Sequence, residues 1–204
     1  MSIKDTRLIL GSNSPRRREL LSLITEDFEV ITCDIDERAI EEQLEANGVS
    51  VLFVSEMLAK AKAMAVYEML AKEGDDDIVV IGADTSVING SVIYGKPEDR
   101  DDAVRMLTEL SGITHVVATG VAIAYKGGVK TFTEESLVEF YKLDEYQKKR
   151  IEEYVSSGDP MDKAGAYGIQ GGASLLIKGI EGDYFNIVGL PVSRLARELS
   201  FVLD

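Results

Sequence analysis

Basic and acidic side chains are distributed along this 204-residue chain in a pattern that suits phosphate chemistry. The basic groups that fall in loops or near expected element ends are Arg16, Arg17, Arg18, Lys62, Lys96 and Lys163, and the carboxylates are Glu37, Asp84 and Asp162. Guanidinium and ammonium groups bind phosphate oxygens, and carboxylates without histidine or cysteine partners suit a hard cation such as Mg²⁺ or Mn²⁺. This combination predicts phosphoanhydride chemistry supported by a divalent metal cation.

Three of the cations stand together where a helix is expected to begin. Ser14 is a favoured N-cap residue and Pro15 a favoured first helical residue, which predicts a helix over Pro15–Ile24 after a tight loop. A helix N-terminus carries partial positive charge, so arginines in its first turn indicate a bound anion. The segment therefore predicts a phosphate cradle, with a solvated basic patch as the alternative.

The other candidate groups also have ordinary structural interpretations. Asp84 could cap the turn after its strand, Glu37 could begin a helix, and Lys96 could be a solvated loop residue. No Walker loop and no Gly-x-Ser-x-Gly elbow occurs, and one histidine cannot support both metal and triad chemistry. His115 and the lone Cys33 lie in strand-like runs and are predicted to be structural.

The elements that must position these groups alternate between strands and helices. Ile78–Ile81 is a continuous apolar run typical of a buried strand, and Asp84 follows at its expected carboxyl end, where ligand sites gather in open α/β sheets. Asn89-Gly90 predicts a hairpin turn. The other expected strands are Arg7–Leu10, Phe28–Ile35, Thr114–Tyr125, Val129–Lys142, Ser174–Ile177 and Tyr184–Val188. The expected helices are Arg38–Asn47, Val51–Lys72, Asp99–Leu110, Glu145–Ser156 and a last helix ending at Val202, and the whole predicts an α/β fold with a mixed sheet.

Composition narrows the classes of protein that fit. The length predicts a single domain over residues 1–204, and no apolar run is long enough for a membrane span. The net charge of −14, from 22 basic and 36 acidic residues, argues against binding to nucleic acid or acidic membranes. A polyanionic small substrate would need a local cluster of basic side chains. The single cysteine fits the reducing cytoplasm.

A series of short motifs resembles the Maf family of nucleoside triphosphate pyrophosphatases over nearly the whole chain. In family order the matching pieces are Ser12-Asn13-Ser14-Pro15-Arg16-Arg17, Asp36-Glu37, Lys62-Ala63, Gly82-Ala83-Asp84-Thr85, Gly95-Lys96-Pro97, Ser111-Gly112-Ile113-Thr114-His115, Asp162-Lys163-Ala164-Gly165-Ala166-Tyr167-Gly168-Ile169-Gln170-Gly171 and Gly189-Leu190-Pro191. Each piece is weak evidence alone, but their order along one chain is specific.

The resemblance implies a Maf/inosine-triphosphatase-like α/β fold, in which helices flank a mixed, twisted sheet and an active-site cleft lies between two lobes. It implies cleavage of a nucleoside triphosphate between the α- and β-phosphates. Asp84 would accept the proton, Lys96 and Glu37 would assist catalysis, and Glu37 and Asp84 would hold Mg²⁺, Mn²⁺ or Co²⁺. The residues that it assigns to substrate binding are Ser12, Ser14, Arg16, Arg17, Lys62, Thr85, Lys163 and Gln170.

The resemblance also implies a substrate class, because the family divides at the loop that contains Gly168-Ile169-Gln170. The branch similar to this chain acts on dTTP and UTP, and a second branch, which has Lys and Glu there, acts on 7-methyl-GTP. The neutral amide of Gln170 offers a donor and an acceptor, which match the edge of uracil or thymine. Arg16 and Thr85 would share in base selection, and removal of modified uridine triphosphates would be a house-cleaning role.

Two other functional classes stay open at this point. The family is linked to division arrest in bacteria, so a nucleotide-binding regulator of septum formation that acts by protein contact is one alternative. A phosphatase or sugar-phosphate enzyme is another, on the residues alone. The expected partners are a nucleoside triphosphate and, by resemblance, a second copy of the chain in a homodimer, with no nucleic acid and no membrane.

Overall fold

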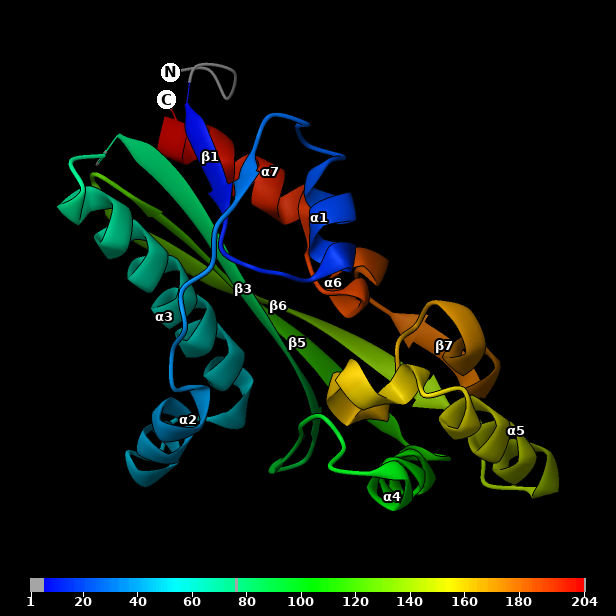
Figure 1. Cartoon of the computed structure of the whole chain (residues 1–204). Coiled ribbons are helices and arrows are strands. Elements are labelled where there is room, and N and C mark those ends of the chain that lie inside the picture. The colour runs from blue at the N-terminus through cyan, green and yellow to red at the C-terminus, as the bar shows by residue number, and fades with distance from the viewer. Residues whose placement is uncertain (1–5, 76, 204) are drawn as a thin grey trace. The chain divides into compact units, whose positions relative to one another are not determined.

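The computed structural model describes residues 6–75 and 77–203, and Figure 1 labels most of its elements. The strands are β1 (Arg7–Leu10), β2 (Glu29–Val30), β3 (Ile78–Asn89), β4 (Val92–Tyr94), β5 (Thr114–Tyr125), β6 (Gly128–Phe140) and β7 (Ile177–Glu181). The helices are α1 (Pro15–Leu21), α2 (Glu37–Ala46), α3 (Val51–Lys72), α4 (Arg100–Leu110), α5 (Glu145–Ser156), α6 (Tyr184–Val188) and α7 (Val192–Leu203). Three short 3-10 turns, η2 (Asp159–Asp162), η3 (Ala164–Ala166) and η4 (Gly171–Leu176), precede β7.

The strands of the described chain form one sheet in the order β2-β1-β3-β5-β6-β7, with β4 paired to β3. Strand β1 is parallel to both β2 and β3, whereas β4 and β7 are antiparallel to their neighbours. The sheet is therefore mixed, with helices packed against it, and this confirms the predicted α/β class. None of the helices in the described ranges combines the length and apolar character needed to cross a bilayer.

The chain divides into two compact units, as expected for two lobes. The first comprises Met1–Asp84, Thr119–Glu134 and Gly189–Asp204, and the second comprises Thr85–Ala118 and Glu135–Val188. Strands β3, β5 and β6 each contribute residues to both units. The expected cleft between the lobes, and the expectation that residues 1–204 act as one domain, stay predictions.

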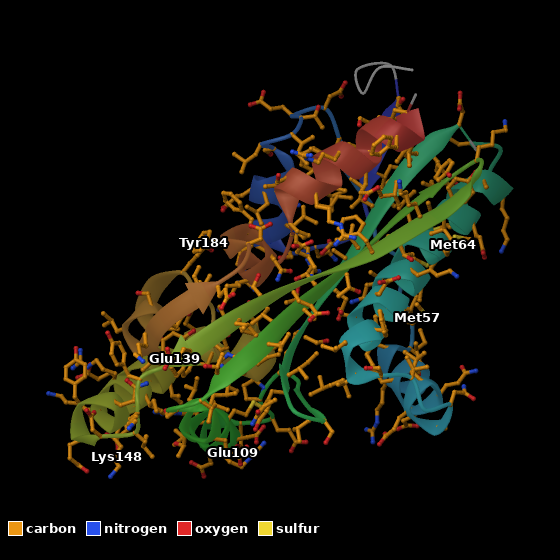
Figure 2. All side chains as sticks on the ribbon, turned by 180° about the vertical axis from the view of Figure 1, so that it is seen from behind. Met57, Met64, Glu109, Glu139, Lys148 and Tyr184 are labelled. Atoms are coloured by element: carbon orange, nitrogen blue, oxygen red, sulfur yellow. The ribbon has the colours of Figure 1, made fainter. Side chains whose placement is uncertain are left out.

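The core of the first unit lies between α3 and the sheet. Buried side chains of α3 pack against β1, β3 and β5 in one cluster, whose members are Ile9, Ala59, Ala63, Val66, Leu70, Ile78, Val80, Ala122 and Ala124. Figure 2 shows the side chains between α3 and the strands, where Met64 also packs against this cluster. The alternate residues Val79 and Ile81 are buried as well, because a strand covered on both faces points successive side chains in opposite directions.

Gly82 allows α3 to lie unusually close to β3. A Cβ atom at this position would be 2.3 Å from the Ala59 carbonyl oxygen and 2.8 Å from the Ala63 nitrogen. Only hydrogen fits there, and the small side chains of Ala59 and Ala63 leave the helix backbone accessible. This contact fixes the position of α3 on the sheet, and α3 carries Lys62.

Replacing Gly82 with alanine is expected to destabilise the protein. Because the nearest atoms are helix backbone, α3 must move, and overpacking of this kind costs about 1–3 kcal/mol. Urea unfolding measures the change, with Gly179→Ala as the matched control because a Cβ there meets no atom within 4 Å. Equal stability of the two variants would contradict this reading of the helix–strand contact.

Three predicted strands differ from the structure. Strand β2 covers only Glu29–Val30 of the expected Phe28–Ile35, because its partner β1 ends at Leu10, whose carbonyl accepts the Ile31 N–H at 3.2 Å. Cys33 consequently lies outside a strand and is half-buried.

The two short strands expected near the C-terminus are also wrong. Residues 184–188 form helix α6, where the Asp183 carboxylate accepts the Phe185 N–H at 2.8 Å and the buried Asn186 amide donates to Val117 O and Ser136 Oγ. Residues 174–176 belong to η4, which the Ser174 hydroxyl closes by donating to Gly171 O at 2.6 Å. A short apolar run fits either conformation, and these polar bonds decide it.

Candidate active site

Three predicted site residues of the first unit form a connected charge cluster. Lys62 Nζ lies 2.7 Å from Asp84 Oδ1 and 3.0 Å from Glu37 Oε2. The side chains of Lys62 and Asp84 are only 17% and 16% exposed, so their charges interact with little screening by water. Lys60, two residues away on α3, is exposed, because residues two apart on a helix do not share a face.

Asp84 lies within a strand and not after one, contrary to the prediction. Strand β3 continues to Asn89, because residues 87–89 pair with β4 in the expected hairpin. The parallel neighbour β1, however, ends at Leu10 opposite Ile81. Asp84 therefore lies beyond the carboxyl end of the adjacent strand β1. The end of β1, and not the end of β3, provides the position at which ligand sites gather in open α/β sheets.

The start of α2 supplies the second carboxylate of this cluster. Asp36 caps the helix by accepting the Ala39 N–H at 3.0 Å, and Glu37 is the first helical residue. Glu41 lies one turn further, and burial together with the charges of Asp84 and Glu37 raises its pKa. Sequence analysis missed Glu41, although the four-residue spacing from Glu37 places both on one helix face.

The donor set fits a divalent cation shared with a substrate. Within residues 6–75 and 77–203, no three His, Cys, Asp or Glu side chains are arranged to hold a metal by themselves. Glu37 and Asp84 offer oxygen ligands only, and Mg²⁺ is commonly held by one or two carboxylates plus substrate phosphates. The oxygen donors of Glu37 and Asp84 therefore suit a hard cation such as Mg²⁺.

The predicted cradle at α1 is anchored by Arg17. Its Nε donates to the Gly189 carbonyl at 2.9 Å and its Nη1 to Ser12 Oγ at 3.2 Å, while Ser14 Oγ accepts the Arg17 N–H as expected of the N-cap. Burial lowers the pKa of Arg17, and the charges of Asp84 and Glu37 oppose this effect. Arg16 is half-buried and Arg18 is exposed. The helix ends at Leu21 and not at Ile24.

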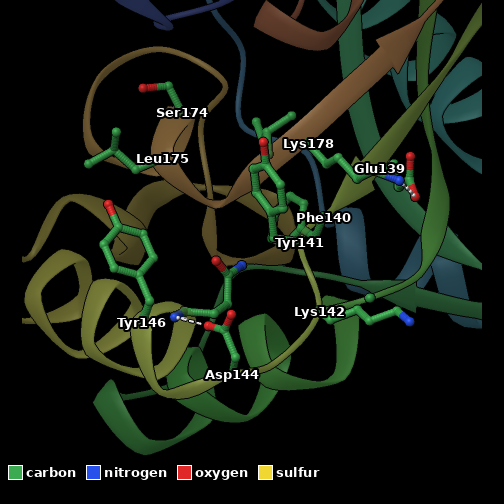
Figure 3. A pocket seen from close by; sticks show the side chains of 12 residues that line it. Glu139, Phe140, Tyr141, Lys142, Asp144, Tyr146, Ser174, Leu175 and Lys178 are labelled. Carbon is green, nitrogen blue, oxygen red and sulfur yellow. Dashed lines mark hydrogen bonds and ion pairs between the residues drawn. The ribbon is translucent and has the colours of Figure 1, made fainter.

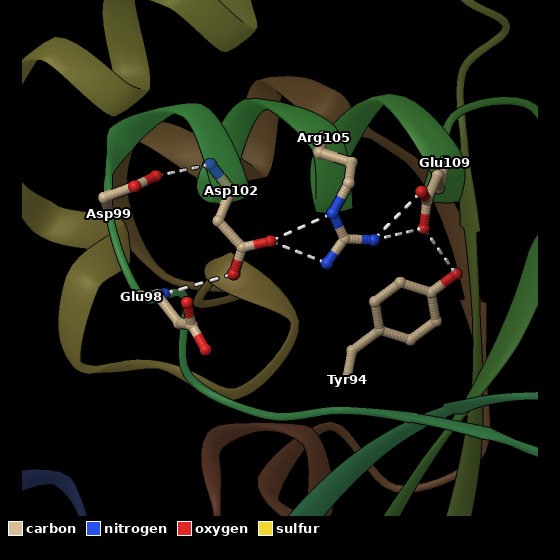
Figure 4. A network of polar contacts seen from close by, with 6 residues as sticks. All are labelled: Tyr94, Glu98, Asp99, Asp102, Arg105 and Glu109. Atoms are coloured by element: carbon tan, nitrogen blue, oxygen red, sulfur yellow. Dashed lines mark hydrogen bonds and ion pairs between the residues drawn. The ribbon is translucent and has the colours of Figure 1, made fainter.

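Lys96 lies in the second unit on a loop that is fixed on both sides. Before it, the Tyr94 hydroxyl donates to Glu109 at 3.1 Å, and after it, the Glu98 N–H donates to Asp102 at 3.1 Å. Arg105 bonds both carboxylates and joins the two ends of this network on α4 (Figure 4). The exposed Lys96 side chain is thus presented by a short, restrained segment.

The segment that contains Lys163 and Gln170 contacts the Lys96 loop. The Gly165 N–H donates to the Gly95 carbonyl at 3.0 Å. Lys163 is buried, and its Nζ bonds Asp159 and Asp162 at 2.9 and 2.7 Å, so its charge holds this segment together. Gln170 is exposed and Thr85 half-buried. The roles of Lys163, Gln170 and Thr85 toward substrate stay predictions.

A pocket of about 750 Å³ lies elsewhere in the second unit. Figure 3 shows Tyr141 and Tyr146 on either side of it, with Leu175 on the same side as Tyr146. Its other lining residues are Gly112, Glu139, Phe140, Lys142, Asp144, Gln147, Ser174, Ile177 and Lys178. None of them is a predicted site residue, although Gly112 belongs to the Ser111–His115 motif.

Comparison with known proteins places the motifs in a family. Residues 7–202 match the family model for Maf-like proteins. The chain belongs to the Maf family. A dTTP/UTP pyrophosphatase of Bacillus cereus (strain B4264) is 45% identical over 194 residues, which cover 95% of this chain and 94% of that protein. A dTTP/UTP pyrophosphatase of Geobacillus sp. (strain WCH70) is 45% identical over 193 residues, which cover 95% and 96% of the two chains.

In this Maf chain, the first unit brings together Glu37, Lys62 and Asp84, and Arg17 binds Ser12 and approaches the same charges. The second unit brings the Lys96 loop against the segment before Gln170. Asp84 and Thr85, which are consecutive, end one unit and begin the other. The Gly189-Leu190-Pro191 motif contributes a structural contact to this unit, since the Gly189 carbonyl accepts a hydrogen bond from Arg17 Nε.

Proposed function

We propose that this protein hydrolyses dTTP, UTP and modified uridine triphosphates between the α- and β-phosphates. The products are the nucleoside monophosphate and pyrophosphate, and removal of non-standard nucleotides is the corresponding role. The observation that carries the proposal is the partly buried Asp84–Lys62–Glu37 cluster, found in a chain whose relatives named dTTP/UTP pyrophosphatase align over 95% of its length.

The side chains of the site divide the steps of this reaction among them. Asp84 orients a water molecule and accepts its proton as the oxygen bonds to the α-phosphorus. The bond from the α-phosphorus to the bridging oxygen breaks, and pyrophosphate leaves with the electron pair. Lys62, Lys96 and the arginines of the cradle, Arg16 and Arg17, bind phosphate oxygens and stabilise the negative charge that develops. Ser12 and Ser14 contribute hydroxyl groups to the same loop.

A divalent cation completes the proposal. Glu37 and Asp84 would hold Mg²⁺, Mn²⁺ or Co²⁺ together with phosphate oxygens, and the bound cation would neutralise charge on the triphosphate. The Lys62 ammonium group forms ion pairs with the carboxylates of both Glu37 and Asp84. It therefore holds them in place with a positive charge before a cation binds.

Base preference is assigned to Gln170, with Thr85 and Arg16. The exposed Gln170 amide can accept the N3–H of uracil or thymine and donate to a ring carbonyl. A base with the opposite pattern leaves these groups unpaired, which costs about 1–3 kcal/mol for each group.

A panel of nucleoside triphosphates tests the function. We expect rapid release of pyrophosphate from dTTP, UTP and 5-substituted or isomeric uridine triphosphates, and slow release from purine triphosphates, in the presence of Mg²⁺, Mn²⁺ or Co²⁺. Analysis of the products identifies the bond that is cleaved. Release of inorganic phosphate would indicate a phosphatase, and the absence of turnover would favour a regulator. Hydrolysis of GTP or 7-methyl-GTP at a rate equal to or above that of dTTP would refute the substrate assignment.

Arg17 and Arg18 make a matched pair of test sites in one helix turn. Arg17→Ala should lower kcat/KM for dTTP by roughly tenfold to a hundredfold, because charge-assisted bonds contribute about 1.5–3 kcal/mol. Arg18→Ala should have little effect, since this side chain is exposed. Steady-state kinetics and thermal melting of both variants measure the difference. A greater loss in Arg18→Ala would mean that the cradle is wrongly placed.

We also propose that the protein acts in the cytoplasm as a homodimer. The single cysteine suits a reducing compartment, and the dimer follows from the family resemblance. Sedimentation equilibrium of the purified chain measures its oligomeric state.

A further inference from the structure

A buried histidine lies against the segment that precedes Gln170. His115 on β5 is 1% exposed, and its Nε2 lies 2.7 Å from the hydroxyl oxygen of Tyr167. Phe140 meets both rings edge-on, with centroid distances of 5.2 Å to His115 and 4.9 Å to Tyr167. Burial lowers the pKa of His115 to about 4, so the imidazole is neutral at neutral pH.

Packing alone does not account for a histidine at this position. Nδ1 of His115 is buried and has no hydrogen-bond partner among the described residues. An unpaired buried polar atom carries a desolvation penalty that a phenylalanine of similar shape would avoid. Compared with phenylalanine, a histidine adds one favourable contact here, its hydrogen bond to Tyr167. We therefore attribute the presence of a histidine at position 115 to this bond.

Tyr167 belongs to a segment with an unusual backbone. Gly165 and Ala166 both have positive φ angles, 66° and 58°, and a Cβ at Gly165 would meet the Val87 side chain at 2.8 Å. A positive φ is unfavourable for alanine and persists only where neighbouring contacts enforce it. Three bonds do so here. The Gly165 N–H donates to Gly95 O, the Gly168 N–H donates to the Tyr154 hydroxyl at 3.3 Å, and Tyr167 bonds His115.

The buried part of the segment is therefore held by hydrogen bonds, and the polar side chain of Gln170 follows it. Residues 165–167 and 169 are buried, whereas Gln170 is exposed. Tyr167 precedes Gln170 by three residues, so a shift of the Tyr167 ring moves the backbone that carries the amide. We propose that His115 is a positioning residue that, through Tyr167, holds Gln170 in place to select a uracil or thymine base. This inference rests on the proposed function, because that function assigns base selection to Gln170.

The test compares base selectivity in variants that remove the hydrogen bond with little loss of packing. Tyr167→Phe removes only the hydroxyl, and His115→Phe keeps an aromatic ring. Each should lower the ratio of kcat/KM for dTTP to that for GTP by about tenfold, chiefly through a higher KM for dTTP. Competitive inhibition by inorganic pyrophosphate, which has no base, should stay unchanged. His115→Gln should recover much of the selectivity, because its amide nitrogen can occupy the place of Nε2.

Two controls separate positioning from general loss of stability. Ile123→Val changes a buried residue of the same strand and should leave selectivity intact whatever its effect on thermal melting. In a Gln170→Ala background, Tyr167→Phe should have no further effect on selectivity, because the two residues act in series. Equal losses for dTTP, GTP and pyrophosphate, or additive effects of Tyr167→Phe and Gln170→Ala, would overturn the inference.

Binding measurements keep this inference distinct from the proposed hydrolysis. Calorimetric titration with α,β-imido analogues of dTTP and GTP reports base selectivity without turnover. Selective binding by the wild type with no pyrophosphate release would refute the proposed hydrolysis and still allow the comparison of variants. Equal binding of both analogues by the wild type would overturn the inference directly.

Discussion

Asp84→Asn is expected to reduce the turnover of dTTP by about 10²–10⁴-fold, the usual range for loss of a general base. The asparagine oxygen can still accept the Lys62 ammonium group, which lies 2.7 Å from Asp84 Oδ1 in the wild type. The change is nearly isosteric, and β3 holds the backbone, so the fold should persist. What is lost is the charge and the basicity.

Turnover with dTTP and Mg²⁺ and thermal melting of Asp84→Asn measure this effect. Asp34→Asn is the matched control, because Asp34 is an exposed carboxylate three residues before Glu37 and has no assigned role. A folded Asp84→Asn protein with turnover within about tenfold of the wild type would remove Asp84 from the mechanism. Attention would then move to Glu37 and to Glu41.

Lys62→Met should produce the second large effect, a loss of roughly 10²–10³-fold in kcat/KM, which is typical when one preorganised donor is removed from a reacting phosphate or carbonyl group. The substitution also leaves Asp84 and Glu37 without the cation that both bind. Unfolding free energy should fall by about 1.5–3 kcal/mol, the usual value for hydrogen bonds to charged groups.

A measurement without nucleotide distinguishes this electrostatic role from simple loss of packing. In Lys62→Met the carboxylates no longer share their oxygens with an ammonium group, so added Mg²⁺ or Mn²⁺ should raise the melting temperature more than it does in the wild type. Lys60→Met, on the exposed side of the same helix, should behave like the wild type in every assay. Similar losses in both variants would show that the Lys62 effect does not come from the charge cluster.

Much of the architecture was accessible from local sequence signals. The bounds of α3, α5 and β5 agree with the predicted ranges, because these long segments lie between glycine-containing turns or capping residues that mark their ends in the sequence. The Asn89-Gly90 signal likewise placed the hairpin, although the observed pairing of Asn89 with Val92 makes Gly90-Ser91 the two-residue loop.

Short segments were less accessible. Residues 184–188 contain too few positions to distinguish a strand from a helix, and bonds from Asn186 to Val117 and Ser136 decide the matter. The strand expected over Phe28–Ile35 needs a paired neighbour along its length, but its partner β1 ends at Leu10. In each case the deciding partner is distant in sequence, so a local window does not contain it.

The sequence by itself determined which reactive side chains are present, and arginines, lysines and carboxylates without histidine or cysteine partners predict phosphate groups and hard cations as their ligands. Only the tertiary structure decided which of these charges meet. Lys62 reaches Asp84, 22 residues away, because Gly82 lets α3 lie directly on β3. Lys163, which the resemblance groups with the substrate-binding residues, bonds Asp159 and Asp162. Side-chain type is a local property, whereas the distance between two charges depends on how helices and strands pack.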